Sequence, residues 1–163
     1  MACKPLSRRG FTFVELILVT LVMVILLAAS LPAFSHSAAR MRVERTAFSM
    51  AQLFRYARER AVSQSQTILW VWSPESRTVK LEQLSEGGAR AALTGRFVES
   101  EAVAQDVTVS LIRDKDIVET VGFFEDGTSE SARLTLTHVQ SQYTITVDGS
   151  TGQVTLVKGL VVD

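Results

Sequence analysis

Hydrophobic positions divide the chain into three stretches with different periods. The first, residues 11–34, is a nearly unbroken apolar run, FTFVELILVTLVMVILLAASLPAF, in which Glu15 is the only charged residue. About two dozen helical residues, each rising 1.5 Å, span the roughly 30 Å hydrocarbon core of a bilayer. This stretch is therefore predicted to be a transmembrane helix.

The second stretch, residues 35–66, keeps a helical period but is amphipathic. Apolar residues recur at three- and four-residue steps, while arginines and other polar residues fill the positions between them. The apolar positions are Val43, Ala47, Met50, Phe54, Ala57 and Ala61. We expect one long helix that continues to about Ser63, with most of this stripe packed into the core of the domain that follows.

Pro32 falls inside the long helical run. A proline removes one backbone hydrogen bond from a helix and bends its axis. We therefore expect a helix kink at Pro32; the alternative is that the proline ends the membrane span.

The third stretch, residues 67–163, consists of short β-type runs separated by turn compositions. These runs are rich in β-branched and aromatic residues, or alternate between polar and apolar positions. Six or seven strands are predicted, at 67–72, 78–84, 107–112, 121–124, 133–137, 143–147 and 153–157. Residues 85–105 carry no decisive pattern. The predicted fold class is α+β, with an antiparallel sheet packed on the distal half of one long N-terminal helix.

Charge changes sign along the chain although the formal net charge is zero. Residues 1–10 carry three positive charges, residues 35–66 carry net +4, and residues 67–163 carry net −6. Positive charge before an apolar helix keeps that end in the cytoplasm, so the acidic head is expected across the membrane. An acidic head also argues against nucleic acid as a partner.

Residues that could carry chemistry are few. The only cysteine, Cys3, lies in the basic start, and the only histidines are His36 and His138, so no Cys/His or multi-histidine metal site is expected. The runs 114–116 (DKD) and 148–150 (DGS) could each offer oxygens to Ca²⁺, but such a site needs six to eight. We expect no enzyme, no cofactor and no metal site.

Residues 9–16, RGFTFVEL, resemble the processing site of the type IV prepilin family, with Phe13 in place of the usual leucine. The resemblance implies that residues 1–10 are a leader peptide. Prepilin peptidase would cut between Gly10 and Phe11 and methylate the new amino terminus of Phe11. The glycine suits a cut site because it has no side chain to hinder an extended backbone in a protease cleft.

Glu15 has a physical rationale beside this resemblance. A carboxylate within an apolar membrane helix is costly unless it has a partner or lies near an interface. Cleavage at Phe11 would create a cation, and the amine of one subunit could neutralise Glu15 of its neighbour in a low-dielectric filament core. Glu15 is therefore expected to guide filament assembly. The alternative is a single-pass signal anchor with Glu15 near the interface.

Three segments beyond the apolar run resemble the H-type minor pseudopilins of type II secretion and their minor-pilin relatives. They are 56–62 (YARERAV), followed by a Trp-containing strand, and the turns 124–127 (FEDG) and 151–154 (TGQV). The resemblance implies a structural subunit near the tip of a periplasmic filament. It also implies an inner-membrane protein with a cytoplasmic N-terminus and a periplasmic head. Its partners would be other pseudopilins, prepilin peptidase, the inner-membrane assembly platform and secreted proteins.

Two other functions stay open. The first is a minor pilin of a type IV pilus, serving adhesion, motility or DNA uptake. Its DNA-binding relatives end in an arginine-rich Thr-Gly-Arg-x-Arg stretch, where this chain has Gln153 and Thr155. The second is an unrelated membrane-anchored periplasmic binding domain that never polymerises.

Overall fold

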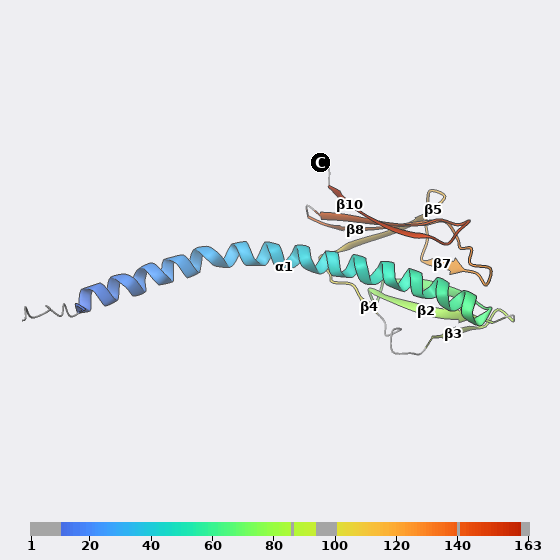
Figure 1. Ribbon diagram of the computed structural model, residues 1–163, viewed down its shortest axis with the longest axis horizontal. Helices are drawn as coiled ribbons and strands as arrows, with labels where there is room; N and C mark the ends of the chain where they lie inside the picture. Colours follow the sequence, from blue (N-terminus) through green and yellow to red (C-terminus); the bar gives the residue numbers. More distant parts are fainter. Residues whose placement is uncertain (1–10, 86, 94–100, 140, 161–163) are drawn as a thin grey trace, which may run out of the picture. The chain divides into compact units, whose positions relative to one another are not determined.

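One long helix and ten strands make up the described part of the chain (Figure 1). The computed structural model describes residues 11–85, 87–93, 101–139 and 141–160. The chain forms two compact units, Met1–Ala39 and Arg40–Asp163. The predicted leader, 1–10, lies outside the described residues.

Helix α1 spans Phe13–Gln64, one residue beyond the predicted end. Its last turn closes with Ser65 in the left-handed region (φ 50°) and backbone hydrogen bonds from Ser65 to Val62 and from Gln66 to Ala61. This pattern is a Schellman motif, which satisfies carbonyls that would otherwise be unpaired at a helix end. The helical backbone runs through Pro32, so the proline does not end the helix, and the kink stays a prediction.

All side chains from 11 to 28 are exposed, and most of them are large and apolar. Within the described residues, no helix is both long enough and apolar enough to cross a membrane. The transmembrane helix at 11–34 therefore stays a prediction.

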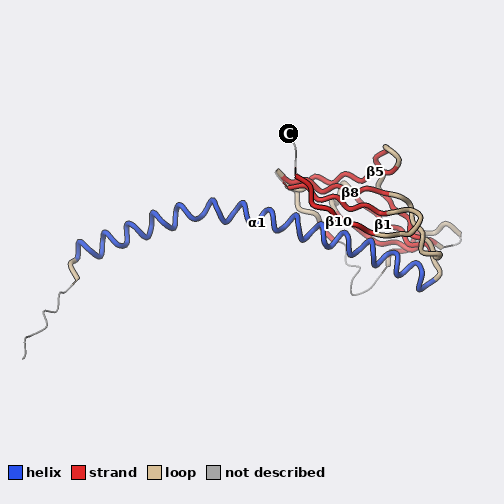
Figure 2. The backbone as a smooth tube through the Cα atoms, turned by 45° about the horizontal axis from the view of Figure 1, so that its top comes forward, coloured by secondary structure: helices blue, strands red, loops and turns tan. Residues whose placement is uncertain are grey.

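Two antiparallel five-stranded sheets form the head, and both views place them alongside the distal half of α1 (Figures 1 and 2). The first sheet has the order β3-β2-β1-β7, with β4 also paired to β2. Its strands are β1 (Thr67–Ser73), β2 (Thr78–Leu84), β3 (Arg90–Ala92), β4 (Glu101–Ala102) and β7 (Thr120–Phe123). The second sheet has the order β10-β9-β8-β5-β6. Its strands are β5 (Thr108–Arg113), β6 (Asp116–Ile117), β8 (Ala132–His138), β9 (Ser141–Val147) and β10 (Val154–Leu160).

The core lies between the apolar stripe of α1 and the inner faces of the sheets. All six predicted stripe residues of α1 are at most 1% exposed, which confirms that the stripe packs into the head. Phe54 stacks on Trp70 of β1 with ring centroids 4.8 Å apart and contacts Phe123 of β7 at 5.9 Å. Alternate residues of the strands complete the core, because successive side chains of a strand point to opposite faces of a sheet.

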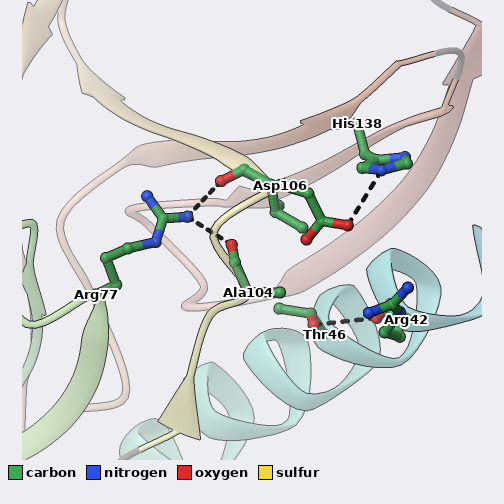
Figure 3. A network of polar contacts seen from close by, with 7 residues as sticks. Arg42, Thr46, Arg77, Ala104, Asp106 and His138 are labelled. Carbon is green, nitrogen blue, oxygen red and sulfur yellow. Dashed lines mark hydrogen bonds and ion pairs between the residues drawn. The ribbon is translucent and has the colours of Figure 1, made fainter. Parts of the chain in front are cut away.

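Arg77, in the turn between β1 and β2, ties the two sheets together (Figure 3). Its guanidinium donates to the carbonyl oxygens of Ala104 and Val107 at 2.7 and 2.6 Å, and to that of Val103 at 3.3 Å. Because residues 103–107 lead from β4 in the first sheet to β5 in the second, this one side chain holds the crossover segment in place.

A second contact holds the same crossover segment from the other sheet. His138, at the end of β8, lies with its Nε2 atom 3.2 Å from the Oδ2 atom of Asp106 (Figure 3). Figure 3 also shows the Thr46 hydroxyl donating to the Arg42 carbonyl within α1, a local helical contact.

The α+β class and all seven predicted strand positions are confirmed, with corrections of detail. The head has two sheets rather than one, and β3, β4 and β6 were not predicted, because strands of two or three residues carry no visible alternation. Asp114 and Lys115 form a turn at positive φ, and Asp116 begins β6. β3 and β4 lie in the undecided stretch 85–105, of which 86 and 94–100 lie outside the described residues.

Candidate functional site

The start of α1 is closed by a side-chain cap. The Thr12 hydroxyl accepts a hydrogen bond from the Glu15 amide at 3.2 Å, and the Thr12 carbonyl accepts one from the Leu16 amide, also at 3.2 Å. Thr12 is thus the N-cap residue, and Thr12 and Glu15 have the spacing of a capping box. Glu15 lies in the first helical turn, where the partial positive charge of the helix start favours a carboxylate.

Glu15 and Phe11 are both accessible. The side chain of Glu15 is exposed and Phe11 is 80% exposed. In the part of the chain that the structure describes, the Glu15 carboxylate makes no ion pair. Gly10 lies outside the described residues, so the cleavage site itself stays a prediction. The arrangement leaves the carboxylate open to a cation from another chain.

The three segments that resemble minor pseudopilins, one in α1 and two in the head, each contribute one residue to a cluster that we call the motif cluster: Arg58, Gly127 and Gly152. The Arg58 Nε atom donates to the Gly127 carbonyl oxygen at 3.1 Å, although 69 residues separate them in sequence. A Cβ atom on Gly152 would lie 2.4 Å from that same oxygen and 2.6 Å from the Arg58 Nε atom. Only a residue without a side chain fits there.

A groove of about 520 Å³ opens beside the motif cluster. It is lined by Arg55, Arg58, Glu59, Thr151, Gly152, Gln153 and Val154. The Arg55 Nη2 atom lies 3.4 Å from the Val154 carbonyl oxygen. Among the described residues, neither arginine has a carboxylate within ion-pair distance. Chemically, a guanidinium in this situation can bind a carboxylate of another molecule.

Asp126 and Asp148 organise the turns next to the motif cluster. Hydrogen bonds from the hydroxyls of Ser150 and Thr151, and then from the Thr151 amide, hold the pKa of Asp148 below its usual range. The hydroxyl and amide of Thr128 likewise lower the pKa of Asp126. Both carboxylates therefore hold their own loops in shape.

The structure brings together parts of the two runs that could offer oxygens to Ca²⁺. Asp114 and Asp148 line the same cavity, of about 410 Å³, with Ser131. However, no group of three or more His, Cys, Asp or Glu side chains that could hold a metal ion occurs within the described residues.

Three contacts in the structure were not predicted from the sequence. The Thr12 cap has a sequence signal, because Thr followed three residues later by Glu is the capping-box pattern. Arg77 has none, since it bonds to main-chain carbonyls far along the chain. Glu130, whose Oε2 atom accepts the Gly122 amide at 2.8 Å, also has none.

Comparisons with known proteins agree on the fold. The minor pseudopilin EpsH of the type 2 secretion system of Vibrio cholerae matches with a TM-score of 0.62 at 12% identity, covering 72% of this chain and 97% of that one. The type IV minor pilin FimU of Pseudomonas aeruginosa matches with a TM-score of 0.59 at 19% identity, covering 73% of this chain and 90% of that one. No curated protein sequence matches significantly.

A family profile described as type II transport protein GspH matches residues 46–152. This range is well over half of the chain and contains all three residues of the motif cluster, Arg58, Gly127 and Gly152. The resemblance to H-type minor pseudopilins is thereby confirmed. The chain belongs to the GspH family of type II transport proteins.

Proposed function

We propose that this chain is a minor pseudopilin that acts as a structural subunit of the type II secretion filament, near its tip, and catalyses no reaction. The observation that carries the proposal is the GspH family match over residues 46–152. Membership of this family implies assembly with other pseudopilins in a periplasmic filament. The finer partners, the inner-membrane assembly platform and secreted proteins, belong to the proposal.

The N-terminus would enter the filament by the route common to prepilins. We propose a cut by prepilin peptidase between Gly10 and Phe11, methylation of Phe11, and a membrane helix over 11–34 that leaves the head in the periplasm. Exposed apolar side chains from 11 to 28 support the membrane helix, and the positive charge of residues 1–10 supports its orientation. The exposed carboxylate of Glu15 is the proposed partner of a neighbour's amine.

Mass spectrometry of the mature N-terminus in a host with prepilin peptidase tests the processing. The expected product begins at a methylated Phe11. An intact Met1, or cleavage near Ala29, would contradict the filament function.

Glu15→Ala tests the assembly role. The variant should insert into the membrane normally, because it removes a charge from an apolar run. It should fail to co-assemble with the other pseudopilins, because the neighbour's amine then loses its carboxylate. Cross-linking to the other subunits and secretion of a reporter substrate measure the effect.

Thr20→Ala is the matched control, because it removes a polar side chain from the same exposed helix without changing charge. It should assemble like the unaltered chain. Normal assembly of Glu15→Ala would refute the role of Glu15.

A minor pilin of a type IV pilus is the second candidate, favoured by the similarity of fold to FimU. Deleting the gene separates the two functions. Loss of protein secretion with intact pili supports the pseudopilin, whereas loss of pili with intact secretion supports the pilin.

A further inference from the structure

Strand β10 forms an open edge of the second sheet. It pairs with β9 on one side and has no strand on the other within the described residues. The Gln153 carbonyl accepts the Asp148 amide at 3.0 Å, so it points toward β9. Backbone amides and carbonyls alternate in direction along an antiparallel strand. The backbone groups of Thr155 and Val157 therefore also point toward β9, while those of Leu156 and Lys158 point away from the sheet.

The position of the Val154 carbonyl supports this alternation. Val154 precedes Leu156 and Lys158 at two-residue steps, so the backbone groups of all three residues point the same way. The Val154 carbonyl oxygen faces the Arg55 guanidinium rather than β9. No hydrogen bond to the outward amides or carbonyls of Leu156 and Lys158 is found in the ranges that the structure describes. These groups are therefore available to an extended chain.

The other sheet edges are short or covered. β3 has three residues, while β4 and β6 have two each. The outer edge of β7 is covered, because the Gly122 amide donates to the Glu130 side chain and the Gly122 carbonyl accepts the Glu130 amide. β10, with seven residues, is thus the one long open edge among the described strands. Proteins usually shorten or cover such edges to prevent unwanted pairing, so an edge kept open suggests a use.

Side chains along this edge indicate what would bind. The groove with Arg55 and Arg58 lies where β10 begins, and Lys158 lies farther along the strand, so basic groups flank both ends of the edge. Glu59 also lines the groove but leaves it net positive. Val157, 54% exposed beside the edge, offers an apolar surface to a cross-strand neighbour.

We propose that β10 is a strand-addition site for an extended, acidic segment of another subunit of the same filament. The segment would pair with the outward backbone groups of Leu156 and Lys158 and place a carboxylate against Arg55 and Arg58. Main-chain hydrogen bonds would supply affinity, and the arginine groove would supply specificity. This inference rests on the proposed function, because it takes its partner from the filament.

Amide hydrogen exchange on the full chain in detergent, alone and with each purified pseudopilin of the same system, tests the proposal. The amides of Leu156 and Lys158 should exchange rapidly alone and at least about tenfold more slowly with one of the subunits. The amides of Thr155 and Val157 should change little, because β9 already protects them. Failure of every subunit to slow exchange at Leu156 and Lys158 would overturn the proposal.

Two variants, each with its own control variant, separate the backbone contribution from the charge. Lys158→Pro deletes an outward amide that has no partner within the described chain, and Lys158→Ala keeps that amide while removing the charge. Arg55→Glu reverses a charge in the groove, and Arg45→Glu makes the same change on α1 outside the groove. We expect at least about tenfold weaker binding of the partner by Lys158→Pro and Arg55→Glu than by their controls.

Circular dichroism and the free energy of unfolding should show that all four variants remain folded. Equal binding by each variant and its control would contradict the proposal. Normal, Glu15-dependent assembly without slower amide exchange in β10 would contradict this inference alone. Absence of any co-assembly by the unaltered chain would contradict the proposed function itself.

Discussion

Gly152 is a residue at which a single added methyl group should destabilise the head. Its φ is +62°, and a Cβ atom would clash with the Gly127 carbonyl oxygen and the Arg58 side chain. We expect Gly152→Ala to lower the free energy of unfolding by about 1–3 kcal/mol, because both the backbone and the contact are strained. Denaturant unfolding of the folded head measures the change.

Gly87→Ala is the matched control for this prediction. A Cβ atom at Gly87 would meet nothing within 4 Å. The control should leave stability almost unchanged. Equal stability of Gly152→Ala and Gly87→Ala would show that the motif cluster tolerates a side chain.

Asp148 should make the head sensitive to acid. Its pKa is lower in the folded chain than in the unfolded one, because the hydroxyls of Ser150 and Thr151 donate to the ionised carboxylate. This contribution to stability is present above the unfolded aspartate pKa, about 4, and is lost as pH falls through the lower folded pKa. Asp148→Asn keeps an acceptor oxygen without titrating.

The free energy of unfolding measured against pH tests this expectation. It should fall less steeply below about pH 4 in Asp148→Asn than in the unaltered chain. Identical pH profiles would mean that the turn does not depend on the charge of Asp148.

Among the elements, the crossover from β4 to β5 depends on Arg77. A lysine there keeps the charge but cannot reach three carbonyl oxygens in a fixed geometry. We expect Arg77→Lys to lower the free energy of unfolding by about 1–3 kcal/mol, because partly buried carbonyls lose their donors. The amide of Val103, which donates to the Arg77 carbonyl, should also exchange faster.

Arg133→Lys serves as the control, since Arg133 is exposed on β8 and has no hydrogen bond from its side chain among those of the described chain. It should change neither quantity. An effect of Arg77→Lys no larger than that of the control would show that the crossover is held by other contacts.

The elements that sequence predicts well are those with a sustained period. The stripe from Val43 to Ala61 repeats over five turns, so the buried face of α1 follows from it. β1 and β2 have long β-type runs, and their pairing follows from the short turn between them. β3, β4 and β6 are too short to show a period and depend on neighbouring strands for their existence.

The candidate site was predictable only in pieces. Each segment of the motif cluster has a recognisable sequence, but the contact between Arg58, Gly127 and Gly152 requires the register of both sheets. The open edge of β10 is likewise a property of strand order, which no local pattern contains. Hydrophobic periodicity predicts helices and strands, but it does not predict which of them lie side by side in the fold.

At the scale of the whole molecule, the head should fold without the apolar N-terminal run. Every buried hydrophobic residue that the structure describes lies between Val43 and Val154, within the unit Arg40–Asp163. We therefore expect a chain that begins at Arg40 to unfold cooperatively, since burial of this core drives folding. Near-ultraviolet circular dichroism during heating measures it.

A chain that begins at Ala51 is the control, because it lacks Val43, Ala47 and Met50, all at most 1% exposed. It should be markedly less stable. Non-cooperative unfolding of the longer chain would show that the first unit is needed for the fold.

The cap at Thr12 determines what the proposed cleavage would do to the helix. The proposed cut after Gly10 would leave Phe11 and the capping hydroxyl of Thr12 in place, so the mature chain would keep a formed first turn. The same cut would place a new cation beside the positive end of the helix macrodipole, where cations are unfavourable. Processing would thus raise the electrostatic energy of an isolated subunit, and docking beside a neighbour's carboxylate would relieve it. In this way the leader would prevent polymerisation before processing, because the amine that favours docking forms only when the leader is removed.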